Sequence, residues 1–219
     1  MANTILHKRS STASATPSAG SLTVGELAIN TADGKLFTKK TNGTVVEIGA
    51  GSGGGGGGGT KTYAVFTPLD GVPATGNFPT INTTANTTTV YEFDPATDET
   101  VYFIGIMPEA AVLTSGLKVR LHWCSATATT GTCRWGVQFE RMNTSTGSNS
   151  FDTAATAGTA TSGTAQVPVV TEITITTIDG ITAGDAFRLA VYRDADGTSG
   201  TDDLTTDARL IAVEVRSAS

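Results

Sequence analysis

Residues 117–124, LKVRLHWC, and residues 133–141, CRWGVQFER, alternate apolar and polar side chains along two extended runs. A period of two places every second side chain on the same face of a β-strand, so each run has one apolar and one polar face. FRLAVYR at 187–193 and RLIAVEVR at 209–216 repeat the pattern. Strands with one apolar face are typical of antiparallel sheets that pack against each other. These runs predict an all-β protein with a sandwich core.

Other short apolar runs, separated by clusters of Gly, Thr, Asp and Asn, continue this pattern through residues 61–219. No amphipathic helical period lies between them, and about eight strands without helices are typical of an antiparallel sandwich. We therefore expect a β-sandwich of the jelly-roll type. The expected strands cover residues 62–66, 89–93, 100–106, 117–124, 133–142, 167–176, 185–193 and 208–216.

A run of seven glycines, Gly53–Gly59, divides the chain. Glycine loses more backbone freedom on ordering than any other residue, so this run does not predict a helix or a strand. The run is either a flexible joint or, in a trimer, one of three extended left-handed helices that wind around a shared axis. The expected organisation is a flexible arm at 1–20, a β-meander at 21–49, a polyglycine linker at 50–60 and the sandwich at 61–219.

The glycines at 49–54 formally satisfy G-x-G-x-x-G, but no helix follows them to hold a pyrophosphate at its N-terminus. A net charge of −6 disfavours nucleic acid or an anionic membrane as the main partner. No segment approaches the ~20 apolar residues of a membrane span, and the first twenty residues lack the apolar centre of a signal peptide. We therefore expect a protein made in the cytoplasm that neither inserts into membranes nor binds nucleic acid.

Cys124 and Cys133 are the only cysteines. Alternation places Cys133 on the apolar face of its strand and Cys124 on the opposite face, whereas residues paired directly across two strands share a face. We therefore predict free thiols. His122 lies on a polar face, no Gly-x-Ser-x-Gly elbow accompanies it, and with the two cysteines it offers too few zinc ligands on one face. No catalytic, cofactor or metal residue is expected.

The loop RDADGTSGTDD, residues 193–203, gathers four carboxylates: Asp194, Asp196, Asp202 and Asp203. Oxygen-rich loops of this kind bind Ca²⁺, although the spacing departs from the EF-hand pattern. Asp-Gly and Ser-Gly turns between two core strands explain the loop equally well. The sequence leaves both interpretations open.

Trp123 and Trp135 have the ring size of a sugar-stacking platform, but both lie on apolar alternating faces, where aromatic rings fill sandwich cores. We predict that they are core residues. The stretch at 143–166, NTSTGSNSFDTAATAGTATSGTAQ, is then the better place for a receptor surface, because loops carry recognition on rigid β scaffolds. A polar loop and a contact between protomers are the alternatives for this stretch.

Near the N-terminus, LTVGELAINTADGKLFTKKTNGTVVEIG at 22–49 alternates strand-like runs with turns. Leu27 and Ile29 share one face, Ala32-Asp33-Gly34 supplies a turn, and Asn42-Gly43 is a strong hairpin signal. Fewer than about 50 residues of this kind do not enclose a core that is stable alone. The meander therefore predicts oligomerisation.

Residues 7–49 resemble the N-terminal module of bacteriophage tail fibres, receptor-binding appendages and related virion proteins, whose recurring core is Gly-Glu-Leu-Ala-Ile-Asn-Thr-x-Asp-Gly-Lys-Leu. The resemblance implies a trimeric β-module without enzyme activity that anchors an appendage to the capsid, portal or tail of the virion. FTPLDGVPATGNFPTI at 66–81 and the runs after it also resemble a domain of uncharacterised phage structural proteins. The residues that the first resemblance assigns to attachment and oligomerisation are Gly25, Glu26, Leu27, Ile29, Asn30, Asp33, Gly34 and Leu36.

The sequence and the resemblance together predict a non-enzymatic virion structural protein: a short fibre, a head fibre or a capsid decoration. The expected partners are two further copies of the chain, in a homotrimer, and other virion proteins. The alternative is a receptor-binding, lectin-like adhesin whose sandwich recognises host surface glycan. An appendage enzyme that degrades glycan is a third hypothesis, because a catalytic carboxylate pair cannot be located in one sequence.

Overall fold

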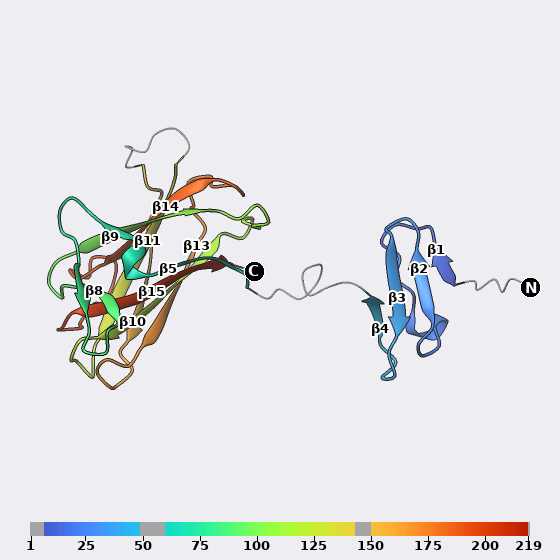
Figure 1. The fold of residues 1–219 in the computed structure, drawn as a ribbon, viewed down its shortest axis with the longest axis horizontal. Coiled ribbons are helices and arrows are strands. Elements are labelled where there is room, and N and C mark those ends of the chain that lie inside the picture. Colours follow the sequence, from blue (N-terminus) through green and yellow to red (C-terminus); the bar gives the residue numbers. More distant parts are fainter. Residues whose placement is uncertain (1–6, 49–59, 143–149, 219) are drawn as a thin grey trace, which may run out of the picture. The chain divides into compact units, whose positions relative to one another are not determined.

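The computed structural model describes residues 7–48, 60–142 and 150–218 and separates the chain into two compact units, Met1–Gly58 (unit 1) and Gly59–Ser219 (unit 2) (Figure 1). The division falls within the predicted linker. The two arrangements predicted for the polyglycine run concern residues 49–59, which lie outside the described residues.

Unit 1 is one four-stranded sheet in the order β1-β2-β3-β4. Its predicted meander consists of β2 (Leu27–Asn30), β3 (Lys35–Lys39) and β4 (Val45–Ile48), which pair antiparallel in sequence order. Strand β1 (Lys8–Ser10) pairs parallel to β2, and a 3₁₀ turn, η1 (Ala19–Ser21), follows it. Gly34 has a φ of 67°, a conformation that glycine adopts without strain, at the turn between β2 and β3.

Residues 8–21 are packed into this unit, which corrects the predicted flexible arm at 1–20 for the part from residue 8 onward. Asn30 is only 1% exposed, and its side-chain amide donates to the carbonyl oxygens of Thr12 and Ala15 at 2.9 and 3.0 Å. The Lys39 amine donates to two further carbonyl oxygens of the segment, at residues 19 and 22. The segment is therefore held by hydrogen bonds from side chains to its backbone. Such contacts produce no apolar periodicity in the sequence, so the pattern of apolar residues did not predict them.

Unit 2 is a sandwich of two sheets (Figure 1). The first sheet has the order β13-β10-β15-β8-β7, with β5 also paired to β15; the second has the order β12-β11-β14-β9-β6. The first-sheet strands are β5 (Thr62–Phe66), β7 (Thr80–Thr83), β8 (Thr89–Phe93), β10 (Leu117–Ser125), β13 (Val169–Ile175) and β15 (Ala208–Ser217). The second-sheet strands are β6 (Gly71–Pro73), β9 (Glu99–Ile106), β11 (Thr132–Arg141), β12 (Ala155–Ala160) and β14 (Ala186–Arg193), and η2 (Pro68–Asp70) precedes β6.

All pairs of neighbouring strands in both sheets are antiparallel, as predicted. The expected strands are present, and their ends lie within two residues of the predicted ones. Strands β6, β7 and β12 were not predicted. Strand β12 lies inside the stretch 143–166, which was expected to be a loop. The prediction missed it because its sequence, ATAGTA, has no large apolar side chain that would mark an inward face. In the described part of the chain, no helix is long and apolar enough to cross a membrane.

The core of unit 2 lies between the two sheets and includes both tryptophans. Trp123 and Trp135 are 0% exposed with ring centroids 6.0 Å apart, and the Trp123 indole donates to Thr171 Oγ1 at 2.9 Å. The prediction that they are core residues is confirmed. The two cysteines are free and buried, which confirms the predicted thiols, and burial raises the pKa of Cys133 well above its usual range.

Candidate functional site

One face of the unit 1 sheet carries two rows of side chains that run across three strands. Ile29 lies opposite Leu36, and Leu36 lies opposite Ile48, so these three form one aliphatic row. Residues paired across neighbouring strands share a face of the sheet. The second row consists of Leu27, Thr38 and Val46. We call these six residues the outer face of unit 1.

The opposite face of the same sheet holds the core of unit 1. Leu22, Ala28 and Phe37 are buried there, and Val45 packs against them. A solvent-open pocket of about 380 Å³ borders Ala28 and Phe37, and the buried apolar side chains of this core are few. On the outer face, by contrast, Ile48 is 41% exposed, and Leu27, Ile29, Leu36 and Val46 are each partly exposed.

The structure separates the residues that the resemblance assigned to attachment into two groups. Leu27, Ile29 and Leu36 lie on the outer face, and each is partly exposed. The other five lie in turns or on the inner side of the sheet, where they hold the unit together. They are Gly25, Glu26, Asn30, Asp33 and Gly34.

Two carboxylates show how these five residues stabilise the unit. Glu26 accepts hydrogen bonds from the Thr23 backbone and hydroxyl at 2.8 and 3.0 Å and pairs with Lys8 at 3.1 Å. The Thr23 backbone hydrogen bond is the main cause of the lowered pKa of Glu26. Asp33 accepts from the Ser14 backbone at 2.6 Å and from the Asn30 amide at 2.9 Å. Both carboxylates therefore fasten the segment that precedes β2.

Val46 and Ile48 complete the outer face, and the sequence analysis did not single them out. The signal was present in VVEI at 45–48, where alternation places Val46 and Ile48 together on one face. Only the register between β3 and β4 shows that this face is shared with Leu36.

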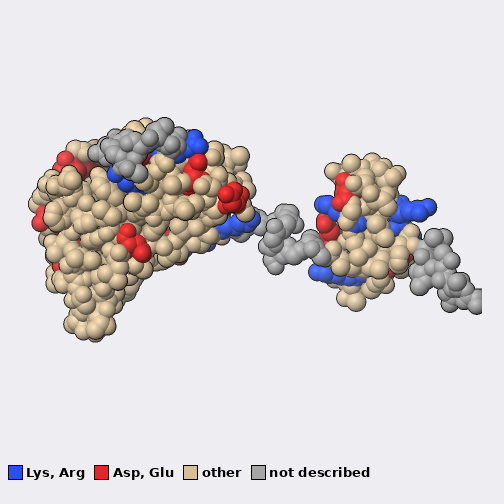
Figure 2. All heavy atoms as spheres, turned by 45° about the horizontal axis from the view of Figure 1, so that its top comes forward, with Lys and Arg blue, Asp and Glu red and all other residues tan. Residues whose placement is uncertain are grey.

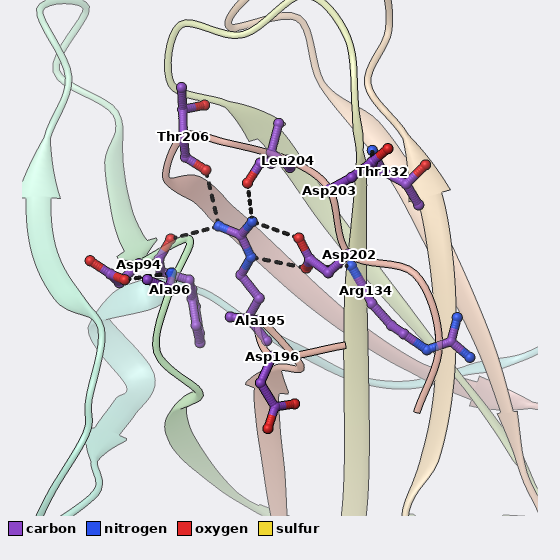
Figure 3. A network of polar contacts seen from close by, with 12 residues as sticks. Asp94, Ala96, Thr132, Arg134, Ala195, Asp196, Asp202, Asp203, Leu204 and Thr206 are labelled. Atoms are coloured by element: carbon purple, nitrogen blue, oxygen red, sulfur yellow. Dashed lines mark hydrogen bonds and ion pairs between the residues drawn. The ribbon is translucent and has the colours of Figure 1, made fainter. Parts of the chain in front are cut away.

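In unit 2, the loop after β14 is organised by a buried arginine (Figure 3). Arg193 is 0% exposed and donates to both carboxylate oxygens of Asp202, at 3.0 and 2.7 Å. It also donates to the carbonyl oxygens of Phe93, Leu204 and Thr206 at 3.2, 2.5 and 3.0 Å. A buried charge of this kind is tolerated because it is paired and fully hydrogen-bonded.

The four aspartates of this loop do not form one cation site. Asp202 is occupied by Arg193, and Asp203 accepts from the Thr132 backbone at 2.6 Å. Asp194 and Asp196 instead meet Asp98, and one oxygen from each lies within 4.8 Å of the others. Asp98 is absent from the sequence prediction because it follows β8, about 100 residues away in the chain.

Hydrogen bonds already engage the carboxylates of this trio. Asp98 accepts from the Ala195 and Asp196 backbones at 2.7 and 3.2 Å. Asp194 accepts from the Thr198 hydroxyl and the Ser199 backbone at 3.0 and 2.9 Å. These contacts hold the loop in place, as the turn interpretation of the sequence expects.

His122 lies on the outer surface of the first sheet, with Nε2 3.7 Å from the Glu214 carboxylate. Among the described residues, the only metal-ligating side chains that gather closely are the three aspartates. The weak zinc set of His122, Cys124 and Cys133 is therefore not assembled within the part of the chain that the structure describes. On the face drawn in Figure 2, the charged side chains of unit 2 are scattered among uncharged ones and form no single basic patch.

The outward surface of the second sheet carries aromatic side chains. Tyr192 lies directly opposite Gly136 in the β11–β14 pair. Tyr102, on β9, stacks with Phe151 at a centroid distance of 5.5 Å and an interplanar angle of 15°. Phe151 belongs to the described end of the stretch at 143–166, whose residues 143–149 lie outside the described ones. The sequence analysis named none of these three rings.

No protein-family model matches this chain, and no curated protein does. Solved structures match at low identity. An exo-beta-1,3-galactanase from Phanerochaete chrysosporium, solved with beta-1,3-galactotriose, is 11% identical over 82% of this chain and 32% of its own, with a TM-score of 0.41. This chain thus spans about a third of that enzyme.

Two carbohydrate-binding modules match over nearly their whole length. The CBM22-1 xylan-binding domain of Xyn10C from Paenibacillus barcinonensis is 9% identical over 73% of this chain and 97% of its own, with a TM-score of 0.42. TmCBM27, described for specific mannan recognition, is 8% identical over 73% of this chain and 99% of its own, with a TM-score of 0.39. The assignment of a β-sandwich rests on the two sheets described above, and no ligand is inferred from these structures.

Proposed function

We propose that this chain is a non-enzymatic structural protein of a bacteriophage particle, in which unit 1 assembles with copies of itself and attaches to the particle while unit 2 is displayed. The observation that carries the proposal is the outer face of unit 1, where two rows of mainly aliphatic side chains cross three strands and each side chain is at least partly exposed. The resemblance of residues 7–49 to virion attachment modules supports the particle as the place of action.

Copies of the same chain are the occupants that suit this face. Among its described residues, unit 1 buries only three apolar side chains, Leu22, Ala28 and Phe37, which is too little apolar surface to offset the ordering of some 40 residues. Burying the outer face as well adds stabilisation of about 25 cal/mol for each Å² removed from water. Strands β1 and β4 each have one neighbour among the described strands, so both edges of the sheet are available for pairing with another protomer. A homotrimer is the expected assembly.

Light scattering during size-exclusion chromatography tests this assembly on the full chain. We expect a mass of about three times the 22.3 kDa protomer. Ile29→Glu and Leu36→Glu place a carboxylate on the outer face and should yield monomers, whereas Thr41→Glu, at an exposed turn, should not. A wild-type chain that is monomeric at micromolar concentration contradicts the proposal. Imaging the protein on virus particles tests whether it attaches to the capsid, portal or tail.

A second function, carbohydrate recognition by unit 2, is favoured by the aromatic side chains on the outward surface of the second sheet. Aromatic rings beside polar groups are the usual lining of ligand sites. It is compatible with the first function, because an anchored sandwich that binds glycan is a receptor-binding adhesin. Binding of the full chain to a glycan array tests it, and release of reducing sugar would instead indicate a glycan-degrading enzyme.

A further inference from the structure

The Tyr192 ring lies flat against the backbone of the neighbouring strand. A Cβ atom placed on Gly136 would be 2.1 Å from Cζ of Tyr192 and 2.5 Å from its hydroxyl oxygen, which real contacts never reach. The ring therefore occupies the space above Gly136 that any other residue would fill with its side chain. One ring face is turned to the sheet, and the Tyr192 residue as a whole is partly exposed.

Polar groups stand around the Tyr192 hydroxyl. Burial is the first cause of the raised pKa of Tyr192, and the charges of Asp194 and Asp98 raise it further, while Arg134 lowers it. The Arg134 Nε atom makes no hydrogen bond and lies 3.7 Å from Asp194. Among the described residues, none accepts a hydrogen bond from or donates one to the Tyr192 hydroxyl. The Tyr192 hydroxyl and the Arg134 Nε atom are therefore both able to form further hydrogen bonds beside the ring.

A second aromatic surface lies on the same side of the sheet. Tyr102 is the cross-strand partner of Ala190, which precedes Tyr192 by two positions on β14, so Tyr102 and Tyr192 project to the same side. The Tyr102 and Phe151 rings are held by Arg188, whose guanidinium carbon lies 5.2 and 4.8 Å from their centroids. This cation–π arrangement favours one orientation of the Tyr102 and Phe151 rings.

From these contacts we propose that the surface around Tyr192 and Gly136 binds a neutral oligosaccharide, with the Tyr192 ring as the stacking surface and Asp98 and Arg134 as hydrogen-bonding groups. This site deepens the carbohydrate function proposed above and rests on it. The apolar C–H face of a pyranose packs on an aromatic ring, while its hydroxyl groups seek carboxylate and guanidinium partners at the rim.

The charge of the site selects against acidic sugars. Asp98, Asp194 and Asp196 place three carboxylates close together beside the ring, and the whole chain carries a net charge of −6. Their field repels carboxylated or sulfated glycans. A neutral chain of hexoses or pentoses is the class of ligand that this arrangement accepts.

Packing of an aromatic ring over a strand glycine also stabilises sheets that bind nothing, so the test must separate the two roles. Isothermal titration of the full chain with neutral hexasaccharides of glucose, mannose, galactose and xylose should reveal binding to at least one of them. Tyr192→Ala should weaken that binding at least tenfold, whereas Tyr192→Phe, which keeps the ring, should change it less than threefold. Phe78→Ala, at a 50% exposed ring outside both sheets, is the matched control and should bind as the wild type does.

The outcomes distinguish the site from the function. If no hexasaccharide binds, both the carbohydrate function and this site are wrong. If binding occurs and survives Tyr192→Ala, the function stands and the site is wrong. Should Tyr192→Ala unfold, amide shifts in the wild-type chain decide: shifts induced by the sugar must centre on residues 134–138 and 190–194, and shifts centred elsewhere overturn the site. An acidic hexasaccharide, such as an oligogalacturonate, should bind at least tenfold more weakly than its neutral counterpart.

Discussion

Unit 1 and unit 2 differ in how much of their apolar surface they bury. Unit 2 packs two sheets together and encloses a continuous core that includes Trp123 and Trp135. Among its described residues, unit 1 has one sheet, a core of three buried apolar side chains and a second face whose mainly aliphatic side chains are partly exposed. A domain that is complete on its own suits display, and a domain that needs a partner suits assembly. The predictions below test this contrast.

The largest change in stability is expected when the ion pair of Arg193, a buried charge in unit 2, is broken. Asp202→Ala removes its carboxylate partner and should lower the free energy of unfolding of unit 2 by about 3–5 kcal/mol, because an unpaired charge then remains buried. Both tryptophans of the chain lie in unit 2, so tryptophan fluorescence during urea denaturation reports this unit alone. Glu109→Ala, at an exposed position, should leave the transition unchanged. An equal, small effect of both substitutions would show that the pair is not needed.

The second prediction concerns concentration. If copies cover the outer face of unit 1, dilution should lower the protection of the β2–β4 amides against hydrogen exchange, because association stabilises only the unit that associates. Amides of β10 and β14 should be protected equally at all concentrations. Leu36→Glu should abolish the concentration dependence. If the protection of the β2–β4 amides in the wild-type chain does not depend on concentration, the prediction that unit 1 needs copies of itself is wrong.

Asn30 provides a smaller test inside unit 1. Asn30→Ala deletes the buried amide that donates to the carbonyl oxygens of Thr12 and Ala15, which should cost about 1–3 kcal/mol because several hydrogen bonds are lost at once. Hydrogen exchange should accelerate first in residues 8–21. Thr41→Ala, at an exposed turn position outside the contacts to this segment, serves as the control. If residues 8–21 keep their protection in Asn30→Ala, the segment is held by something other than this side chain.

The smallest effect is expected from pH at Glu99 in unit 2. Desolvation by burial is the main cause of its raised pKa, so the folded state binds this proton more tightly than the unfolded state does. Stability therefore increases as pH falls through the folded pKa. Glu99→Gln should stabilise unit 2 slightly at pH 7, and the difference from the wild type should disappear near pH 4, where the proton is bound. A variant less stable than the wild type at pH 7 would contradict this.

The sequence predicts the strands of unit 2 well because strict alternation leaves one choice of inward face in runs such as LKVRLHWC and FRLAVYR. It fails at β12, whose small residues carry no such pattern, and at the segment before β2, which is held through Asn30 rather than by apolar contacts. The candidate sites depend on pairings between distant residues. Neither the approach of Asp98 to Asp194 nor the contact of Tyr192 with Gly136 leaves a local pattern in the chain.

The position of β15 bears on the order of events during synthesis. This strand lies inside the first sheet, where it pairs with β10 on one side and with β8 and β5 on the other. Until residue 217 has left the ribosome, the sheet lacks the strand that joins its two halves. Unit 1 pairs only residues that are close in sequence and is finished much earlier. The surface of unit 1 that we propose for assembly is therefore complete while the sandwich is still open.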